Sequence, residues 1–258
     1  MNRPLIRPLA VLLASLLLLT ACQTDARHDP DKRAKLAKLH YQIGLNAIQH
    51  NQLPKAFDEL MQSNELQPNQ PEVLDALAYA WRLRGDLKKA ELYYKKSLRA
   101  SSRSATHNNY GNLLLQMKRY KEAEAQFRKA LDDPRYPNPH IAYINLGDAL
   151  LEQGRFNDAI AAYRQASLLH PRQIVSQLRE AEAYVRYNRP HYAQALYETM
   201  LRKYPQSRPV MQGLLALLEK QGDIAEARRK LATFRDHAKD PLNRAWAVDE
   251  LERLSRHD

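Results

Sequence analysis

Side chains capable of catalysis are scattered along this sequence and form no recognisable motif. Nine histidines occur, and His107 and His140 stand at comparable positions in two of the repeated segments described below, where surface or inter-repeat packing explains them. No HExxH, CxxC, GxSxG or P-loop pattern is present. The acidic pair Asp132-Asp133 stands beside prolines, where acidic residues commonly form turns. We predict that the protein is not an enzyme and binds no metal or cofactor.

The beginning of the chain has the pattern of a secretory signal peptide. Arg3 and Arg7 precede an apolar segment from Leu9 to Leu19. Such a segment spans roughly 17 Å as helix, which is too short for a bilayer core of about 30 Å. A charged start followed by a short apolar segment is typical of a signal peptide. We predict a lipoprotein signal peptide over residues 1–21.

Cys22 is the only cysteine of the chain and follows Leu19-Thr20-Ala21. This stretch resembles the lipobox of bacterial lipoproteins, in which the cysteine is acylated and becomes the new N-terminus. A signal peptide that contains a cysteine by chance is the alternative. The resemblance implies an anchor of acyl chains such as palmitate, and Gln23 in place of Asp implies the periplasmic face of the outer membrane. We predict that residues 22–36 form the lipidated cysteine and a flexible tether.

An internal repeat organises the rest of the sequence. A small residue recurs at intervals of 34, 33, 36, 34 and 34 residues, and an alanine follows each one 12 residues later. Two helices approach closely only where one side is small, so this spacing predicts helical hairpins. The pairs are Gly44/Ala56, Ala78/Ala90, Gly111/Ala123, Gly147/Ala159, Ala181/Ala193 and, with leucine in the first position, Leu215/Ala227.

Other features share the same period. A large apolar residue stands four positions after each alanine, and a turn dipeptide lies between the two predicted helices of each hairpin. Proline ends several repeats, at Pro68, Pro171 and Pro205, because it cannot continue a helix. The large residues are Leu60, Tyr94, Phe127, Tyr163, Tyr197 and Leu231, and the turns are Asn51-Gln52, Gly85-Asp86, Lys118-Arg119, Gly154-Arg155, Asn188-Arg189 and Gly222-Asp223.

These positions resemble the tetratricopeptide repeat (TPR). The resemblance implies an all-α fold, a right-handed superhelix of about six TPR hairpins with a C-terminal capping helix. The insertion Asp132–Pro139, with three prolines, is predicted to form an extended, stiff turn. The predicted units are 37–70, 71–103, 104–139, 140–173, 174–207 and 208–240, and 241–258 is the capping helix, in which Leu242, Trp246, Val248, Leu251 and Leu254 cover the last hairpin.

The formal net charge is +11, with Lys and Arg spread along the chain. A basic protein of this kind adheres to anionic lipid, which an adaptor at a membrane could use. A nucleic-acid reader usually has a recognisable module or a cluster of basic and aromatic residues, and neither occurs here. We therefore predict no nucleic-acid partner.

A protein partner is expected on the exposed face of each first helix. Tyr41, Leu45 and Tyr79 are predicted to form an apolar patch, with packing against the preceding segment as the alternative. Asn108, Asn109 and Asn112 have the spacing of one helical face, and their amides can pair with an extended peptide. Hydrated polar surface is the alternative for these asparagines. The same repeat positions select Ile144, Asn145 and Asp148, and further along the face Asp75, Arg82, Leu151, Arg179, Glu182 and Arg186.

Three stretches resemble the type IV pilus biogenesis and stability lipoproteins called PilF or PilW. They are Tyr41–Leu45, the run Asn108–Leu114, and the insertion around Asp133–Pro137, whereas Leu215 departs from the repeat pattern. The resemblance implies a pilotin, an outer-membrane lipoprotein that binds the secretin subunit and promotes its targeting and multimerisation. Another periplasmic TPR adaptor, for peptidoglycan hydrolases or outer-membrane protein assembly, is the alternative.

Overall fold

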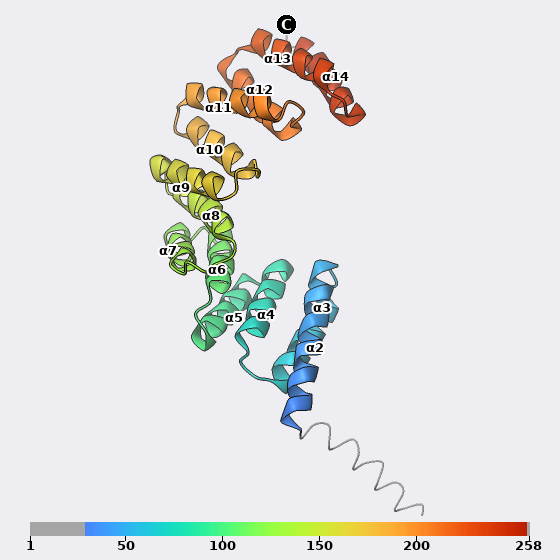
Figure 1. Ribbon diagram of the computed structural model, residues 1–258, viewed down its shortest axis with the longest axis vertical. Coiled ribbons are helices and arrows are strands. Elements are labelled where there is room, and N and C mark those ends of the chain that lie inside the picture. The colour runs from blue at the N-terminus through green and yellow to red at the C-terminus, as the bar shows by residue number, and fades with distance from the viewer. Residues whose placement is uncertain (1–28, 257–258) are drawn as a thin grey trace, which may run out of the picture. The chain divides into compact units, whose positions relative to one another are not determined.

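The computed structural model describes residues 29–256, which contain thirteen helices and no strand. Twelve helices follow one another in six consecutive pairs, and a last helix follows them (Figure 1). The helices are α2 (Pro30–Gln49), α3 (Leu53–Leu66), α4 (Pro71–Arg84), α5 (Leu87–Ala100), α6 (Ser104–Gln116), α7 (Tyr120–Leu131), α8 (Pro139–Glu152), α9 (Phe156–Leu169), α10 (Val175–Arg186), α11 (Pro190–Lys203), α12 (Arg208–Gln221), α13 (Ile224–His237) and α14 (Pro241–Ser255).

The turn inside every pair contains one residue with a positive φ angle. Glycine supplies it at Gly85, Gly154 and Gly222, with φ between 73° and 88°. Asn51, Asn188 and Lys118 adopt φ of 55° to 59° in the other turns. Asparagine tolerates this left-handed conformation and glycine has no side chain to oppose it, so the residue type is matched to the turn at five of the six positions. Each of these residues is the first member of a predicted turn dipeptide.

The small residue of each first helix makes room for the large residue of the second helix. A Cβ atom at Gly147 would lie 2.7 Å from Tyr163 Cδ1, and one at Gly44 would lie 2.7 Å from Leu60 Cγ. These are the large residues 16 positions later, whereas Ala56 O would lie 3.5 Å from the Cβ at Gly44. The tight contact is therefore with the large side chain, and the alanine 12 positions on lies beside it.

The described residues belong to two compact units, 29–113 and 114–256, with the division inside α6. In the first unit a core of Leu60, Val73, Ala76, Leu77 and Ala80 joins α3 and α4. In the second unit a core extends from α10 to α14 and includes Tyr197, Leu214, Leu218 and Leu231. Leu215, the departure from the repeat pattern, is buried in this second core, and Gly213 makes room for Tyr197.

Helix α14 covers its neighbour with only part of the predicted residues. Trp246 lies edge-on to Phe234, with ring centroids 5.7 Å apart, and Leu254 is buried. Leu251 is partly buried against the same core. Leu242 and Val248 are exposed, by 75% and 39%, so their predicted role in covering the hairpin is wrong. Helical periodicity places Val248 on the side of α14 opposite Trp246, whereas Leu242 lies one turn before Trp246, in the first turn of the helix.

One prediction about the connections needs correction. Helix α2 begins at Pro30, so residues 30–36 are helical and do not belong to a flexible tether. Asp29 caps this helix by accepting hydrogen bonds from the backbone of Asp31 and Lys32, at 3.0 and 3.4 Å. The insertion after α7 does contain a turn, in which the Asp133 side chain accepts a hydrogen bond from Arg135 N at 3.0 Å. The signal peptide and Cys22 lie outside the described residues.

No helix within residues 29–256 is long and apolar enough to span a bilayer.

Replacing Gly147 with alanine tests the tight contact. The new methyl group would overlap the Tyr163 ring, which is fully buried and cannot move aside. We expect Gly147→Ala to lower the free energy of unfolding by about 1 kcal/mol or more, since overpacking outweighs the higher helix propensity of alanine. In a Tyr163→Leu background the same change should be neutral or stabilising. Equal effects in both backgrounds, measured by chemical denaturation, would contradict the contact.

Candidate functional site: the first-helix faces

Tyr41 and Leu45 lie on α2 and pack against the core of the first unit. Both are half-buried beside the cluster that contains Leu60 and Leu77. The alternative of packing therefore holds in part, through contacts with α3 and α4. Tyr41 also lines a groove of about 360 Å³ between α2, the end of α3 and the start of α4, together with Lys38, Gln70, Glu72 and Val73. Burial and the neighbouring Asp75 and Glu72 raise the pKa of the Tyr41 hydroxyl.

Asp75 is the acidic residue at the centre of the first-unit face. Its Oδ2 accepts a hydrogen bond from Asn109 Nδ2 at 3.1 Å, which joins α4 to α6. Its Oδ1 is buried and has no hydrogen-bond partner within the described residues. Burial raises the pKa of this carboxyl group, while the Thr106 hydroxyl, the Asn109 amide and the Arg103 charge oppose the rise. An ionised carboxylate in this position lowers the stability of the fold.

Further buried polar atoms in the first unit lack partners. Among residues 29–256, Thr106 Oγ1, Tyr94 Oη and Arg82 Nε are buried without a hydrogen bond. They lie around Asp75 in two facing pairs. The Thr106 hydroxyl is close enough to the Asp75 carboxylate, and the Arg82 guanidinium to the Tyr94 hydroxyl, to oppose the rise in pKa of these groups, although neither pair has the geometry of a hydrogen bond. Burial raises the pKa of Tyr94 far above its ordinary value. Native proteins pair most buried polar groups, so this concentration on and around α4 is unusual.

Tyr79 is half-buried on the same helix as Asp75 and interacts with a cation. The Arg82 guanidinium lies 4.9 Å from the centre of the Tyr79 ring. Tyr79 does not belong to the core cluster around Tyr41 and Leu45. The predicted apolar patch therefore includes one residue with a cation over its ring.

The asparagine run divides into three different environments. Asn108 is buried, with 6% exposure, so its predicted place on an exposed face is wrong. Asn109 is half-buried and is engaged by Asp75. Asn112 is partly exposed. The spacing of three and four residues does place the run near one side of α6, but that side packs against α4 over part of its width.

In the second unit the selected residues are tied to their own hairpins. Ile144, Asn145 and Asp148 are half-buried on α8. Asp148 accepts a hydrogen bond from Tyr163 Oη at 2.7 Å and lies 3.7 Å from Arg179 Nε. Burial raises the pKa of Asp148, while the Tyr163 hydroxyl and Arg179 oppose the rise. Arg179 also pairs with Glu182 at 2.9 Å.

Polar pairs 34 residues apart link consecutive hairpins. Besides Asp75 and Asn109, Glu152 pairs with Arg186 at 2.5 Å and Glu219 pairs with Arg253 at 2.6 Å. These pairs were not predicted from the sequence. Their spacing could have revealed them, because polar residues one repeat length apart stand at the same height on adjacent first helices.

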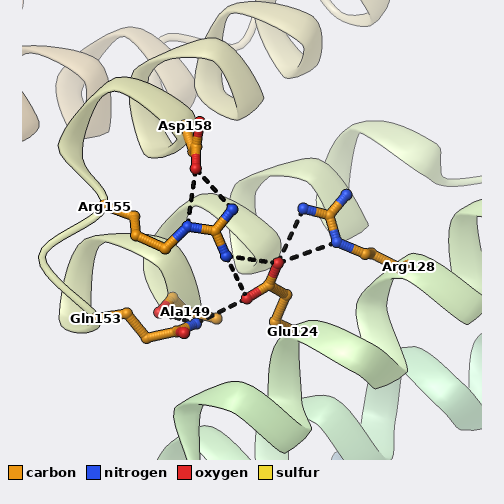
Figure 2. Close-up of polar contacts among 6 residues, drawn as sticks. All are labelled: Glu124, Arg128, Ala149, Gln153, Arg155 and Asp158. Carbon is orange, nitrogen blue, oxygen red and sulfur yellow. Dashed lines mark hydrogen bonds and ion pairs between the residues drawn. The ribbon is translucent and has the colours of Figure 1, made fainter.

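A second missed feature is the cluster around Glu124, which joins α7, α8 and α9 (Figure 2). Glu124 accepts hydrogen bonds from Arg128, Gln153 and Arg155, with every distance between 2.9 and 3.0 Å. Arg155 is held in turn by Asp158 at 2.8 Å. Burial would raise the pKa of Glu124, but these donors outweigh it and lower the pKa. The cluster stabilises the hairpin stack and leaves Glu124 no free acceptor for a partner.

The histidines form local contacts. His107 Nε2 lies 2.9 Å from Ser102 Oγ, and His140 stacks on His170 with ring centroids 4.8 Å apart. Burial and the His170 charge lower the pKa of His140. Within residues 29–256 no group of three or more histidine, cysteine or acidic residues has the arrangement of a metal site.

Comparison with known proteins identifies the repeat. Models of the tetratricopeptide repeat match residues 102–167 and 150–218. Together with the helical pairs and the all-α fold described above, these matches show that the chain contains tetratricopeptide repeats and has a TPR fold.

Within that class the chain is similar to type IV pilus proteins, as its sequence predicted. It is 32% identical to the type IV pilus assembly protein PilF of Pseudomonas aeruginosa over 134 residues, which are 50% of this chain and 53% of PilF. The chain thus matches about half the length of this relative. An uncharacterised protein of Haemophilus influenzae is 28% identical over 111 residues, 43% of this chain and 62% of that protein.

Solved structures of the same kind share the fold. The structure of P. aeruginosa PilF has a TM-score of 0.67 at 23% identity, and covers 84% of this chain and 99% of its own. The structure of PilW, described as a widely conserved type IV pilus biogenesis factor, has a TM-score of 0.70 at 18% identity, with 82% and 98% covered.

The underpaired carboxylate of Asp75 makes a testable prediction about stability. The pKa of the Asp75 carboxyl group is raised in the folded state. The favourable contribution of this group to the stability of the fold is therefore complete below the unfolded pKa of about 4, and it is lost as pH rises through the folded pKa. We expect Asp75→Asn to raise Tm at pH 7 by about 2–4 °C, the change that 1 kcal/mol produces in a chain of this size. The gain should disappear at acidic pH. A Tm at pH 7 that falls in Asp75→Asn would contradict the assignment.

Proposed function

We propose that this protein is a TPR adaptor of type IV pilus biogenesis that binds the secretin subunit of the pilus and promotes its multimerisation. Similarity to PilF supports the pathway, and the absence of a recognisable catalytic motif from the sequence favours an adaptor over an enzyme. Binding of the secretin subunit follows from the family resemblance of the sequence. In this proposal no bond is made or broken, and the free energy of partner binding drives the assembly step.

The observation that carries the partner site is the group of underpaired polar atoms around Asp75. A buried carboxylate oxygen without a hydrogen bond is retained at a cost in stability. Such costs are common where a surface is arranged for a ligand rather than for the fold. The half-buried Tyr41 lies beside this region and lines the groove of α2 and α4. We place the partner-binding surface on this first-unit face, with Asp75 accepting a donor from the secretin segment.

The second part of the proposal is a lipid anchor. Residues 1–21 would act as a lipoprotein signal peptide, and Cys22 would carry the acyl chains. Gln23 in place of aspartate supports the periplasmic face of the outer membrane as the location. The described fold begins at Asp29, only seven residues after Cys22, so the anchor would hold α2 near the membrane surface.

A TPR adaptor for peptidoglycan hydrolases or for outer-membrane protein assembly is the second candidate. The repeats serve equally well there, because the fold supplies a surface and does not choose its occupant. Deleting the gene separates the two. Loss of secretin multimers and of twitching supports the pilus adaptor, whereas a defect in the cell wall or in barrel insertion supports the second candidate.

Binding measurements with purified secretin subunit test the partner surface. Asp75→Asn removes one negative charge and keeps the shape of the side chain, so we expect about tenfold weaker binding, as for the loss of a hydrogen bond to a charged group. The matched control is Asp58→Asn, which removes an exposed charge on α3 in the same unit. Equal affinity of the wild type and Asp75→Asn would place the site elsewhere. Since Asp75→Asn should also be more stable, unfolding cannot explain a loss of binding.

Cell fractionation tests the anchor separately. We expect the Cys22→Ser variant to keep the thermal unfolding of the wild type, because the described fold starts beyond this position. The variant should leave the outer-membrane fraction, since the acyl chains supply most of the membrane affinity. Incorporation of labelled palmitate into the wild type but not into Cys22→Ser would provide the control. Undiminished retention of Cys22→Ser in the outer membrane would contradict a lipid anchor at this residue.

A further inference from the structure

Helix α2 is longer than the repeat requires. The first helices α4, α6 and α12 begin seven residues before their small or equivalent residue, at Pro71, Ser104 and Arg208. Helix α2 begins at Pro30, fourteen residues before Gly44, so it carries seven additional residues. It has 20 residues against 14 in its partner α3. The extension is the first helical part of the described residues (Figure 1), and Arg33 Nη2 donates a hydrogen bond to Leu66 O at 2.9 Å.

The extension exposes leucine side chains on one face. Leu36 and Leu39 are 43% and 50% exposed and lie three residues apart. Ala37 and Gly44, which are buried, lie about a quarter turn around the helix from Leu36. Helical geometry therefore directs Leu39 away from the buried side of α2 and places Leu36 at its border. Each leucine leaves about half of its surface exposed.

Lysines flank the two leucines. Lys32 and Lys35 are exposed on the same side of α2, four residues before Leu36 and Leu39 respectively. Within the described chain Lys35 forms no ion pair, and Lys32 has only a 3.7 Å contact with the exposed Asp29. Long lysine side chains can lie along an apolar surface and keep the ammonium group in water or beside a phosphate. The face is therefore both apolar and cationic.

We propose that this face of α2, formed by Lys32, Lys35, Leu36 and Leu39, lies on the surface of an anionic phospholipid membrane. A specific protein interface normally buries more than about 1,000 Å², which a stripe of two leucines does not provide. A phospholipid surface needs less, since a few apolar side chains and several cations add to a modest affinity. The lipid headgroups supply a negative charge for Lys35, and they can compete with the exposed Asp29 for Lys32. This contact orients the first unit, and it does not depend on the secretin proposal.

Vesicle binding with the full chain tests the face. All variants carry Cys22→Ser and identical residues 1–28, so any contribution of that segment is the same in each. A nitroxide label at Leu39→Cys should become protected from a water-soluble relaxation agent on vesicles that contain phosphatidylglycerol. The control label at Leu242→Cys, on an exposed position of α14, should stay accessible. A label at position 39 that remains as accessible as the control on the bound protein overturns the proposal, as does protection without vesicles, which indicates a second copy on this face.

Charge removal gives an independent measurement. We expect Lys32→Gln/Lys35→Gln to weaken partition into phosphatidylglycerol vesicles by about 20-fold at low salt. Lys88→Gln/Lys121→Gln removes the same charge from exposed positions on α5 and α7 and should have a much smaller effect. Equal losses in both double variants would mean that net charge alone acts, and would overturn the assignment to α2. The vesicle experiments contain no secretin. A negative result in them therefore does not bear on the adaptor proposal, and a negative result in the secretin-binding experiment does not bear on membrane binding by α2.

Discussion

The close approach of two helices at one small residue determines how each hairpin is built and which polar groups reach its face. Gly147 has no side chain, and the Tyr163 ring occupies the space that one would fill. Ring atoms of Tyr163 lie under 3 Å from the position that a Cβ atom would take. The hydroxyl of the same tyrosine donates to Asp148, the residue next to Gly147 on the exposed side of α8. A packing contact thus also orients a carboxylate. Larger residues at this position would separate the helices and break both interactions.

The equivalent contact in the first unit leaves polar groups without partners. In the hairpin of α4 and α5, Tyr94 stands at the repeat position that Tyr163 has in the hairpin of α8 and α9. Ala78 stands at the position of Gly147. The residue after Ala78 is Tyr79 rather than an aspartate, so no carboxylate follows the small residue to receive the Tyr94 hydroxyl, which is buried without a partner. Asp75, one helical turn earlier, also keeps one oxygen unpaired. The two units therefore differ in chemistry at corresponding positions, and the first is the one in which a ligand would gain hydrogen bonds.

Much of the fold was predictable because its determinants are local and periodic. The turn residues Asn51, Gly85 and Gly154 adopt the left-handed conformation that their types favour, and their spacing repeats along the chain. The prediction of Asn108 as an exposed residue failed for a different reason. Helical periodicity gives the side on which a residue lies, but it does not say how far the neighbouring helix covers that side. Likewise, the Glu124 cluster joins three helices, and its members are recognisable only once their heights along the stack are known.

Helix α2 shows how a capping signal outweighs composition. The segment before Leu36 is polar and was expected to be a tether, yet Asp29 followed by Pro30 is a strong helix start. Once helical, the segment has two distinct sides. Tyr41 and Lys38 line the groove next to Glu72, and Leu36 and Leu39 point the other way. A membrane on the leucine side would therefore leave the groove open to a partner. One helix carries both the leucine side and the groove side. A membrane bound to the leucine side would therefore also fix the direction from which a partner reaches the groove.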